Sequence, residues 1–140
     1  MKRYNGGIGQ RQCAWLNEQL RKAEVEGVQV IAASHHAFPR GASADTHRAW
    51  NGDEVADVLT DSPAFVLGLA GHDHPGGFCH YRGRPFVTVE AMLEAPPGSN
   101  AFAVVTVKPA VTLVPGLRFR GGEISIDGCG TIVTNRRFDV

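Results

Sequence analysis

Two short apolar runs, each followed by a histidine, constrain the fold more than any other feature of the sequence. Residues 28–33 (Val-Gln-Val-Ile-Ala-Ala) run through one serine into His35, and residues 65–70 (Phe-Val-Leu-Gly-Leu-Ala) run through one glycine into His72. Continuous apolar runs of this length, bounded by turn residues, predict strands that are covered on both faces. Strands of this kind belong to sheets with helices packed on them, so the sequence predicts an α/β fold.

A helical pattern precedes each of the two runs. Over residues 9–26 the apolar residues recur at three- and four-residue steps, and Gly27 follows as a stop signal. The second helix is predicted to begin after Asn51, which forms a capping-box pattern with Glu54, and to end before Pro63. Two strands joined by a helix in one sheet form a right-handed parallel unit, so both runs should point the same way.

Beyond the second run the pattern changes to β-rich segments separated by Gly and Pro, which predict a mostly antiparallel meander. These segments are residues 85–91, 101–108, 111–114, 123–126 and 131–134. No internal repeat, low-complexity tract or linker divides the chain, so residues 1–140 are predicted to form a single domain. The expected fold class is α/β, with parallel strands and crossover helices followed by an antiparallel β meander.

The charge and composition of the sequence limit the kinds of partner and the cellular location that we expect for the protein. Lys plus Arg and Asp plus Glu number 14 each, so no overall field attracts nucleic acid or an anionic membrane. No apolar run approaches the ~20 residues of a membrane helix, and the first residues lack the apolar core of a signal peptide. We therefore expect a cytoplasmic protein. Cys13, Cys79 and Cys129 share no CxxC spacing, which is typical of reduced thiols.

The histidines predict a metal site. The carboxyl ends of neighbouring parallel strands meet at one edge of a sheet, so His35 should lie near His72 and His74. In an extended backbone, side chains two residues apart project to the same side, so His72 and His74 should converge. Imidazole suits zinc, iron, nickel and copper and, with oxygen ligands added, manganese. The alternative is an incidental pair of surface histidines. Much weaker ligand candidates are His36, Asp45, His47, Asp73 and His80, since polar side chains in loops are usually just exposed to solvent.

Six segments are more specific than the histidine spacing. They are residues 4–9 (Tyr-Asn-Gly-Gly-Ile-Gly), 12–16 (Gln-Cys-Ala-Trp-Leu), 34–35 (Ser-His), 50–55 (Trp-Asn-Gly-Asp-Glu-Val), 69–79 (Leu-Ala-Gly-His-Asp-His-Pro-Gly-Gly-Phe-Cys) and 94–102 (Glu-Ala-Pro-Pro-Gly-Ser-Asn-Ala-Phe). In this order they resemble the C-terminal half of the manganese-dependent ADP-ribose/CDP-alcohol diphosphatases, which are calcineurin-like metallophosphoesterases. The likeness covers about residues 4–108 and is looser beyond them.

The resemblance implies part of a metallophosphoesterase-type β-sandwich that holds two metal ions and splits the pyrophosphate of a nucleotide-linked alcohol or sugar. By position, it implies that His35 and His72 ligate the second metal and that His74 ligates the first. Cys79 lies where the substrate pocket of the family begins. The alternative role for Cys79 is that of a small buried hydrophobe.

The sequence departs from this family in lacking the motifs of its N-terminal half, which supply an Asp-x-His pair, a bridging Asp and an Asn-His pair. Three neutral imidazoles do not offset the charge of two divalent ions, so we expect at most one ion, Mn or Zn, per chain. The chain is expected to be an incomplete metallophosphoesterase that is inactive alone. One alternative is an active phosphodiesterase or pyrophosphatase for a nucleotide diphosphate, completed by oligomerisation or by a separately encoded N-terminal half. Another is a non-enzymatic binding or assembly module. Because a sheet edge would lack its partner strands, we expect a homo-oligomer.

Overall fold

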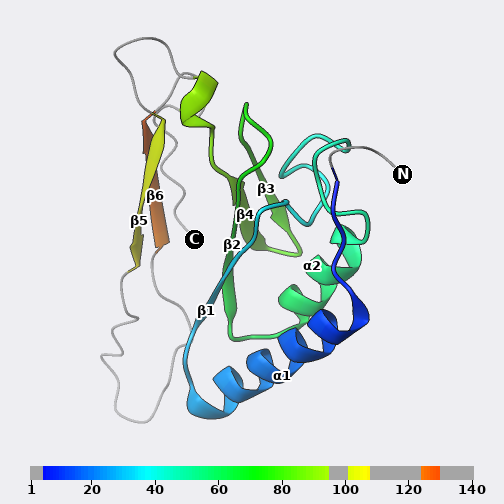
Figure 1. Ribbon diagram of the computed structural model, residues 1–140. Helices are drawn as coiled ribbons and strands as arrows, with labels where there is room; N and C mark the ends of the chain where they lie inside the picture. Colours follow the sequence, from blue (N-terminus) through cyan, green and yellow to red (C-terminus); the bar gives the residue numbers. More distant parts are fainter. Residues whose placement is uncertain (1–4, 95–100, 108–123, 130–140) are drawn as a thin grey trace.

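Two helices cover one face of a four-stranded sheet, and a two-stranded sheet lies against the other face (Figure 1). The computed structural model describes residues 5–94, 101–107 and 124–129. Within these residues the elements are α1 (Gln10–Glu26), β1 (Val30–Ala33), α2 (Gly52–Asp61), β2 (Phe65–Ala70), β3 (Gly77–Tyr81), β4 (Arg84–Thr88), a 3-10 turn (Met92–Glu94), β5 (Phe102–Val107) and β6 (Ile124–Cys129). No helix in these described parts is long and apolar enough to cross a membrane.

The four-stranded sheet has the order β1-β2-β4-β3. Strands β1 and β2 are parallel, with Ala33 opposite Leu69, so their carboxyl ends lie at the same edge. Strand β4 is also parallel to β2, whereas β3 is antiparallel to β4. The predicted α/β class and the parallel direction of the two apolar runs are therefore confirmed.

Helix α1 follows its predicted pattern closely. Leu20 and Ala23 are buried, and the half-buried Cys13 and Leu16 pack against the same core beneath the sheet. Gly27 adopts the left-handed conformation that ends the helix, with φ of 70°. The next residue, Val28, donates its backbone N–H to Ala23 O at 3.0 Å, which helps to close the last turn.

Strand β1 is shorter and more exposed than its apolar run predicts. It begins at Val30 because the backbone of Val28 is engaged at the end of α1. Ile31 keeps 39% of its surface exposed, so the expectation that this strand is covered on both faces is wrong. The reason is its position, because β1 is an edge strand of the described sheet.

Strand β3 was not predicted, and the strands after β2 pair differently from a simple meander. A two-residue turn, Arg82-Gly83, joins β3 to β4 with φ values of 48° and 76°, as type I′ hairpin turns require. Strand β4 joins the parallel strands through β2 as well as pairing with β3. Strands β5 and β6 form the antiparallel pair expected further along the chain. The segments predicted over residues 111–114 and 131–134 lie outside the described residues.

Both faces of the sheet carry apolar cores. On the helix side, Leu59 and Phe65 are fully buried and Phe86 nearly so. On the other side, buried Val66, Leu67 and Val87 contact residues of β5. The described elements therefore form the layered arrangement predicted for part of a β-sandwich flanked by helices.

Helix α2 starts where three segments meet. Gly52 packs so closely on the Phe38 carbonyl that a Cβ atom there would overlap it. Asn51 occupies the N-cap position, yet its side chain makes no capping hydrogen bond, so the predicted capping box is wrong. Instead Asn51 Nδ2 donates to Ile8 O at 2.9 Å, and Asn51 Oδ1 accepts from Ile8 N at 3.0 Å. These bonds fasten the segment before α1 to the start of α2.

The long loop between β1 and α2 is tied down by a buried guanidinium. Arg48 Nε lies 3.0 Å from Asp45 Oδ1, and Arg48 Nη1 lies 3.2 Å from both Phe38 O and Asp53 Oδ1. The Arg48 side chain is 10% exposed and its contact with Phe38 O is buried, whereas the Asp45 and Asp53 carboxylates reach solvent. The loop is therefore held in a fixed position, above the edge of the sheet at which β1 ends.

Candidate metal centre

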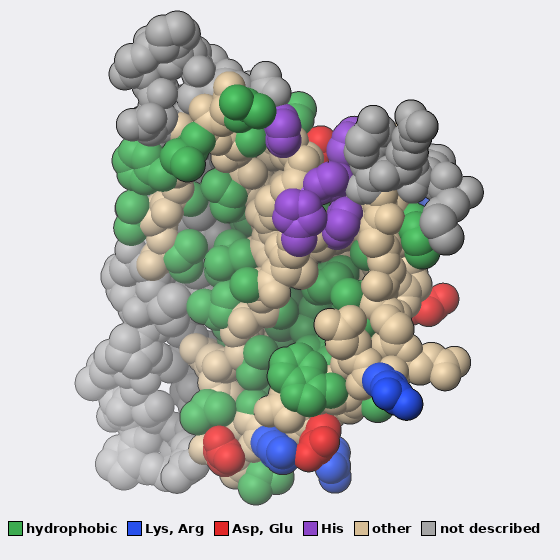
Figure 2. Space-filling view, viewed as in Figure 1, with side chains coloured by type: hydrophobic (Ala, Val, Ile, Leu, Met, Phe, Trp, Pro, Cys, Tyr) green, Lys and Arg blue, Asp and Glu red, His purple; other side chains and the backbone are tan. Residues whose placement is uncertain are grey.

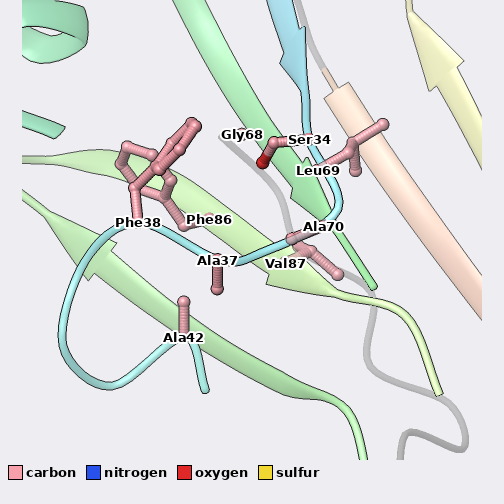
Figure 3. A pocket seen from close by; sticks show the side chains of 9 residues that line it. All are labelled: Ser34, Ala37, Phe38, Ala42, Gly68, Leu69, Ala70, Phe86 and Val87. Carbon is pink, nitrogen blue, oxygen red and sulfur yellow. The ribbon is translucent and has the colours of Figure 1, made fainter. Parts of the chain in front are cut away.

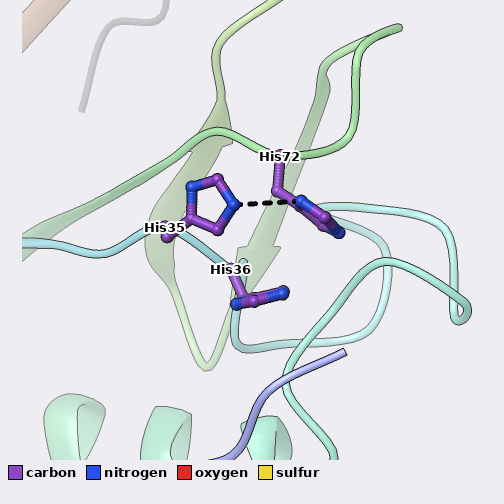
Figure 4. A group of neighbouring side chains, drawn as sticks. All are labelled: His35, His36 and His72. Carbon is purple, nitrogen blue, oxygen red and sulfur yellow. Dashed lines mark hydrogen bonds between the residues drawn. The ribbon is translucent and has the colours of Figure 1, made fainter. Parts of the chain in front are cut away.

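Three imidazoles lie together where β1 and β2 end (Figures 2 and 4). His35 Nε2 and His72 Nδ1 are 3.0 Å apart. The His36 ring lies 4.9 Å from the His35 ring and 4.4 Å from the His72 ring, measured between centroids. One ligand nitrogen from each of the three lies within 4.8 Å of the other two. The predicted approach of His35 to His72 is thus observed, and His36 joins them.

Local hydrogen bonds turn these side chains toward one another. After β1 the chain bends, and Ser34 Oγ donates to His36 O at 2.8 Å. This bend lets the consecutive His35 and His36 face one volume, which an extended strand would forbid. After β2, Asp73 N donates to Gly71 O at 2.8 Å around His72, whose φ is 67°. Such a γ-turn is rare and strained, and strain of this kind concentrates at functional sites.

His74 lies outside the three-imidazole group that the described residues form. It is exposed and sits in the turn that leads to β3, where its backbone carbonyl accepts from Ala91 N at 3.0 Å. The expectation that His72 and His74 project to one side assumed an extended backbone, and the γ-turn at His72 removes that alternation. A metal-binding role for His74 stays a prediction.

Asp73 anchors the facing loop beside this group. Its carboxylate is buried, and Oδ2 accepts from Ser43 Oγ at 2.9 Å and from Ala44 N at 2.7 Å. Its other oxygen lies 3.9 Å from His47 Nδ1, and the His47 ring lies 5.5 Å from that of His72. Asp73 therefore joins the turn that carries His72 to the loop that carries His47.

We expect Asp73→Ala to destabilise the fold by about 1–3 kcal/mol, because the partly buried Ala44 N–H and Ser43 hydroxyl would lose their charged acceptor. Asp73→Asn is the matched control, since its amide oxygen can still accept both hydrogen bonds and it should cost less. Urea denaturation followed by circular dichroism measures the difference. Equal midpoints for the two variants would contradict the anchoring role.

Two further ligand candidates are engaged elsewhere. Asp45 is exposed and accepts from Arg48, and the His80 ring packs edge-on against Phe78 with centroids 5.0 Å apart. Neither belongs to the three-imidazole group.

Cys79 is half-buried on β3 under the loop. A Cβ atom on Gly41 would stand 3.2 Å from Cys79 Cβ, so the loop backbone lies directly against this side chain. Burial raises the pKa of the Cys79 thiol, and the nearby Asp53 carboxylate adds to this. The thiol therefore stays protonated at neutral pH. Its role in substrate binding stays a prediction.

A small cavity lies between the loop and the ends of β2 and β4 (Figure 3). Its volume is about 10 Å³, roughly enough for one water molecule. Apart from Ser34 its lining side chains are apolar, including Phe38, Leu69 and Phe86. It is therefore a packing gap of the core rather than a place for a substrate.

The donor set of the three-imidazole group fits a divalent transition metal. Neutral imidazoles bind zinc, copper, iron and nickel, whereas carboxylate and carbonyl oxygens suit manganese and magnesium. The group found among the described residues contains histidines and no carboxylate. An ion here would keep open positions for water or for a substrate oxygen, as catalytic zinc sites with three histidines do.

Comparison with solved structures gives the class to which this arrangement belongs. The crystal structure of a dimetal phosphatase from Danio rerio superposes with a TM-score of 0.77 and 29% sequence identity, over 96% of this chain and 39% of that one. The chain thus has the architecture of part of a dimetal phosphatase. No protein-family model matches it.

Sequence comparison is more specific. The manganese-dependent ADP-ribose/CDP-alcohol diphosphatases of Oryza sativa subsp. japonica and Homo sapiens are 36% and 34% identical to the chain over 119 and 117 residues. Each alignment covers 81% of the chain, but 36% and 33% of the respective relative. Over the third of their length that it spans, the chain is similar in sequence to the manganese-dependent ADP-ribose/CDP-alcohol diphosphatases.

Proposed function

We propose that this chain is a metal-binding part of a hydrolase that cleaves the pyrophosphate of nucleotide-linked sugars or alcohols, and that it is inactive alone. The observation that carries the proposal is the approach of His35 to His72 at 3.0 Å, from the ends of two parallel strands. The relatives, named for ADP-ribose and CDP-alcohols, support the substrate class.

The chain's own contribution would be to hold and orient an ion. A divalent metal supplies a Lewis acid that polarises phosphoryl oxygens and lowers the pKa of bound water. His35 and His72 would hold such an ion, and His74 would serve a second metal in a completed protein. Cys79 would lie near the substrate.

We propose that the chain alone is inactive because its histidines carry no negative charge to offset the repulsion between two metal ions. Two divalent ions about 4 Å apart repel strongly even at an effective dielectric of about 20, so a metal pair requires anionic ligands between its members. The three-imidazole group supplies none. We therefore propose one ion per chain at most, manganese or zinc.

The proposed partner would pair with an edge of the sheet. Strand β1 is at the edge of the described sheet, and its Ile31 side chain is partly exposed. Such an edge is a template for a further strand. We propose that a second copy of the chain, or a separately encoded N-terminal half, pairs with β1, and that this takes place in the cytoplasm.

We expect the tag-free chain to release no product from ADP-ribose or CDP-choline in the presence of Mn²⁺. Chromatographic detection of the nucleotide monophosphate measures this, with the His72→Ala variant as the control for contaminating activity. Light scattering on the same sample, after size exclusion, reports its oligomeric state.

Turnover that disappears in His72→Ala would contradict inactivity and favour an enzyme completed by self-association. A clean monomer would contradict the proposed pairing of two copies at β1. A protein with neither turnover nor bound metal would favour a non-enzymatic assembly module.

A further inference from the structure

We propose that His36, and not His74, is the third ligand of a single metal ion held by this chain, and that the resulting site prefers zinc-class ions to manganese. The inference rests on the proposed function in one respect, namely that the chain holds a divalent ion. It concerns which side chains do so and which ion they select.

The first argument is the position of the ligand nitrogens. Three nitrogens around a tetrahedral zinc ion, each at about 2.0–2.1 Å, stand roughly 3.3 Å apart. His35 Nε2 and His72 Nδ1 already lie 3.0 Å apart. One ligand nitrogen from each of His35, His36 and His72 lies within 4.8 Å of the other two. Small rotations of the rings would bring all three to one ion. His74 is exposed in the following turn and does not belong to this group.

The second argument is that the fold fixes the orientation of His36. Ser34 holds the backbone carbonyl of His36, as described above. On the other side, a Cβ atom on Gly6 would stand 3.2 Å from both Cε1 and Nδ1 of His36, so the segment before α1 lies against the ring. That segment is itself fastened, because Trp50 N donates to Gly6 O at 3.0 Å. An imidazole packed in this way is positioned before any ion arrives.

The third argument is the chemistry of the donors. With imidazole as the only ligand type in the group, borderline ions such as zinc and cobalt are favoured over manganese, which prefers oxygen ligands. The buried carboxylate of Asp73, the residue after His72, has one oxygen committed to Ser43 and Ala44. The chain would thus differ in metal preference from relatives that are named manganese-dependent.

Calorimetric titration of the tag-free chain with ZnCl₂ and with MnCl₂ tests the proposal. We expect one zinc ion per chain and an affinity for zinc at least about 100-fold above that for manganese. His36→Gln should weaken zinc binding by about 100-fold, whereas the matched variant His74→Gln should change it less than threefold. Urea denaturation of each variant checks that it is folded.

A second variant keeps every imidazole and perturbs only the position of His36. Gly6→Ala should push on the His36 ring and weaken zinc binding by about 10-fold, as displaced supports of metal ligands do. This variant decides the question if His36→Gln proves unstable.

Three results would overturn the inference. They are a loss of zinc affinity in His74→Gln as large as in His36→Gln, equal affinities for zinc and manganese, and the absence of metal binding. Only the last also removes the metal-binding part of the proposed function. Product formation in the hydrolysis assay, by contrast, contradicts the proposed inactivity without bearing on the choice between His36 and His74.

Discussion

Gly52→Ala is expected to destabilise the protein by about 3 kcal/mol, because the new methyl group would overlap the Phe38 carbonyl. A flexible side chain could move away, but this neighbour is backbone. The Phe38 carbonyl accepts from the buried Arg48, and the following Pro39 is itself fully buried. Relief would therefore require the loop or the start of α2 to shift. Urea denaturation followed by far-ultraviolet circular dichroism measures the change in unfolding free energy.

Gly71→Ala is the matched control for this substitution. A Cβ atom at Gly71 would meet no heavy atom within 4 Å, and its backbone lies outside the left-handed region. We expect a change within about 0.5 kcal/mol. A Gly52→Ala protein as stable as the Gly71→Ala protein would show that the contact with Phe38 is not tight in solution.

Phe65→Ala is expected to cost about 3–5 kcal/mol, the usual range for a fully buried phenylalanine. Phe65 has no exposed surface, and its ring lies 5.3 Å from that of Phe86 in the core under the helices. A small domain has a total stability of about 5–15 kcal/mol, so this loss leaves a large unfolded fraction at 37 °C. The midpoint of thermal unfolding measures it.

Phe102→Ala removes the same atoms from an exposed site. The Phe102 side chain on β5 keeps 53% of its surface in contact with solvent, so we expect a change below about 0.5 kcal/mol. If both phenylalanine variants lost similar stability, the core assigned to the helix side of the sheet would be wrong.

The periodicity of apolar residues and the strand–helix–strand order were enough to predict helix α1 and the parallel pairing of β1 with β2. The face of α1 that carries Leu20 and Ala23 is buried as predicted, and the parallel pairing of β1 with β2 brings His35 to His72. These features depend on apolar patterns that extend over several residues, so a single exception does not change the outcome.

Features that depend on single hydrogen bonds were not predictable. The bond from Asp73 N to Gly71 O separates His74 from His72, and the bond from Ser34 turns His36 toward the group. Asn51 looks like a capping residue, yet it binds Ile8, a partner far away in sequence. Strand β3 was not predictable because the first residue of its turn, Arg82, has a positive φ, which an arginine in the sequence does not indicate.

The hydrogen bonds and ion pairs that hold the loop between β1 and α2 also affect how an ion would bind. Arg48 secures this loop through three oxygen partners, and Asp73 fastens it to the turn that carries His72. The conformational entropy of these segments is thus lost during folding and not during metal capture. The rate of capture should then be governed by shedding of water from the ion, and the protein scaffold should hardly rearrange.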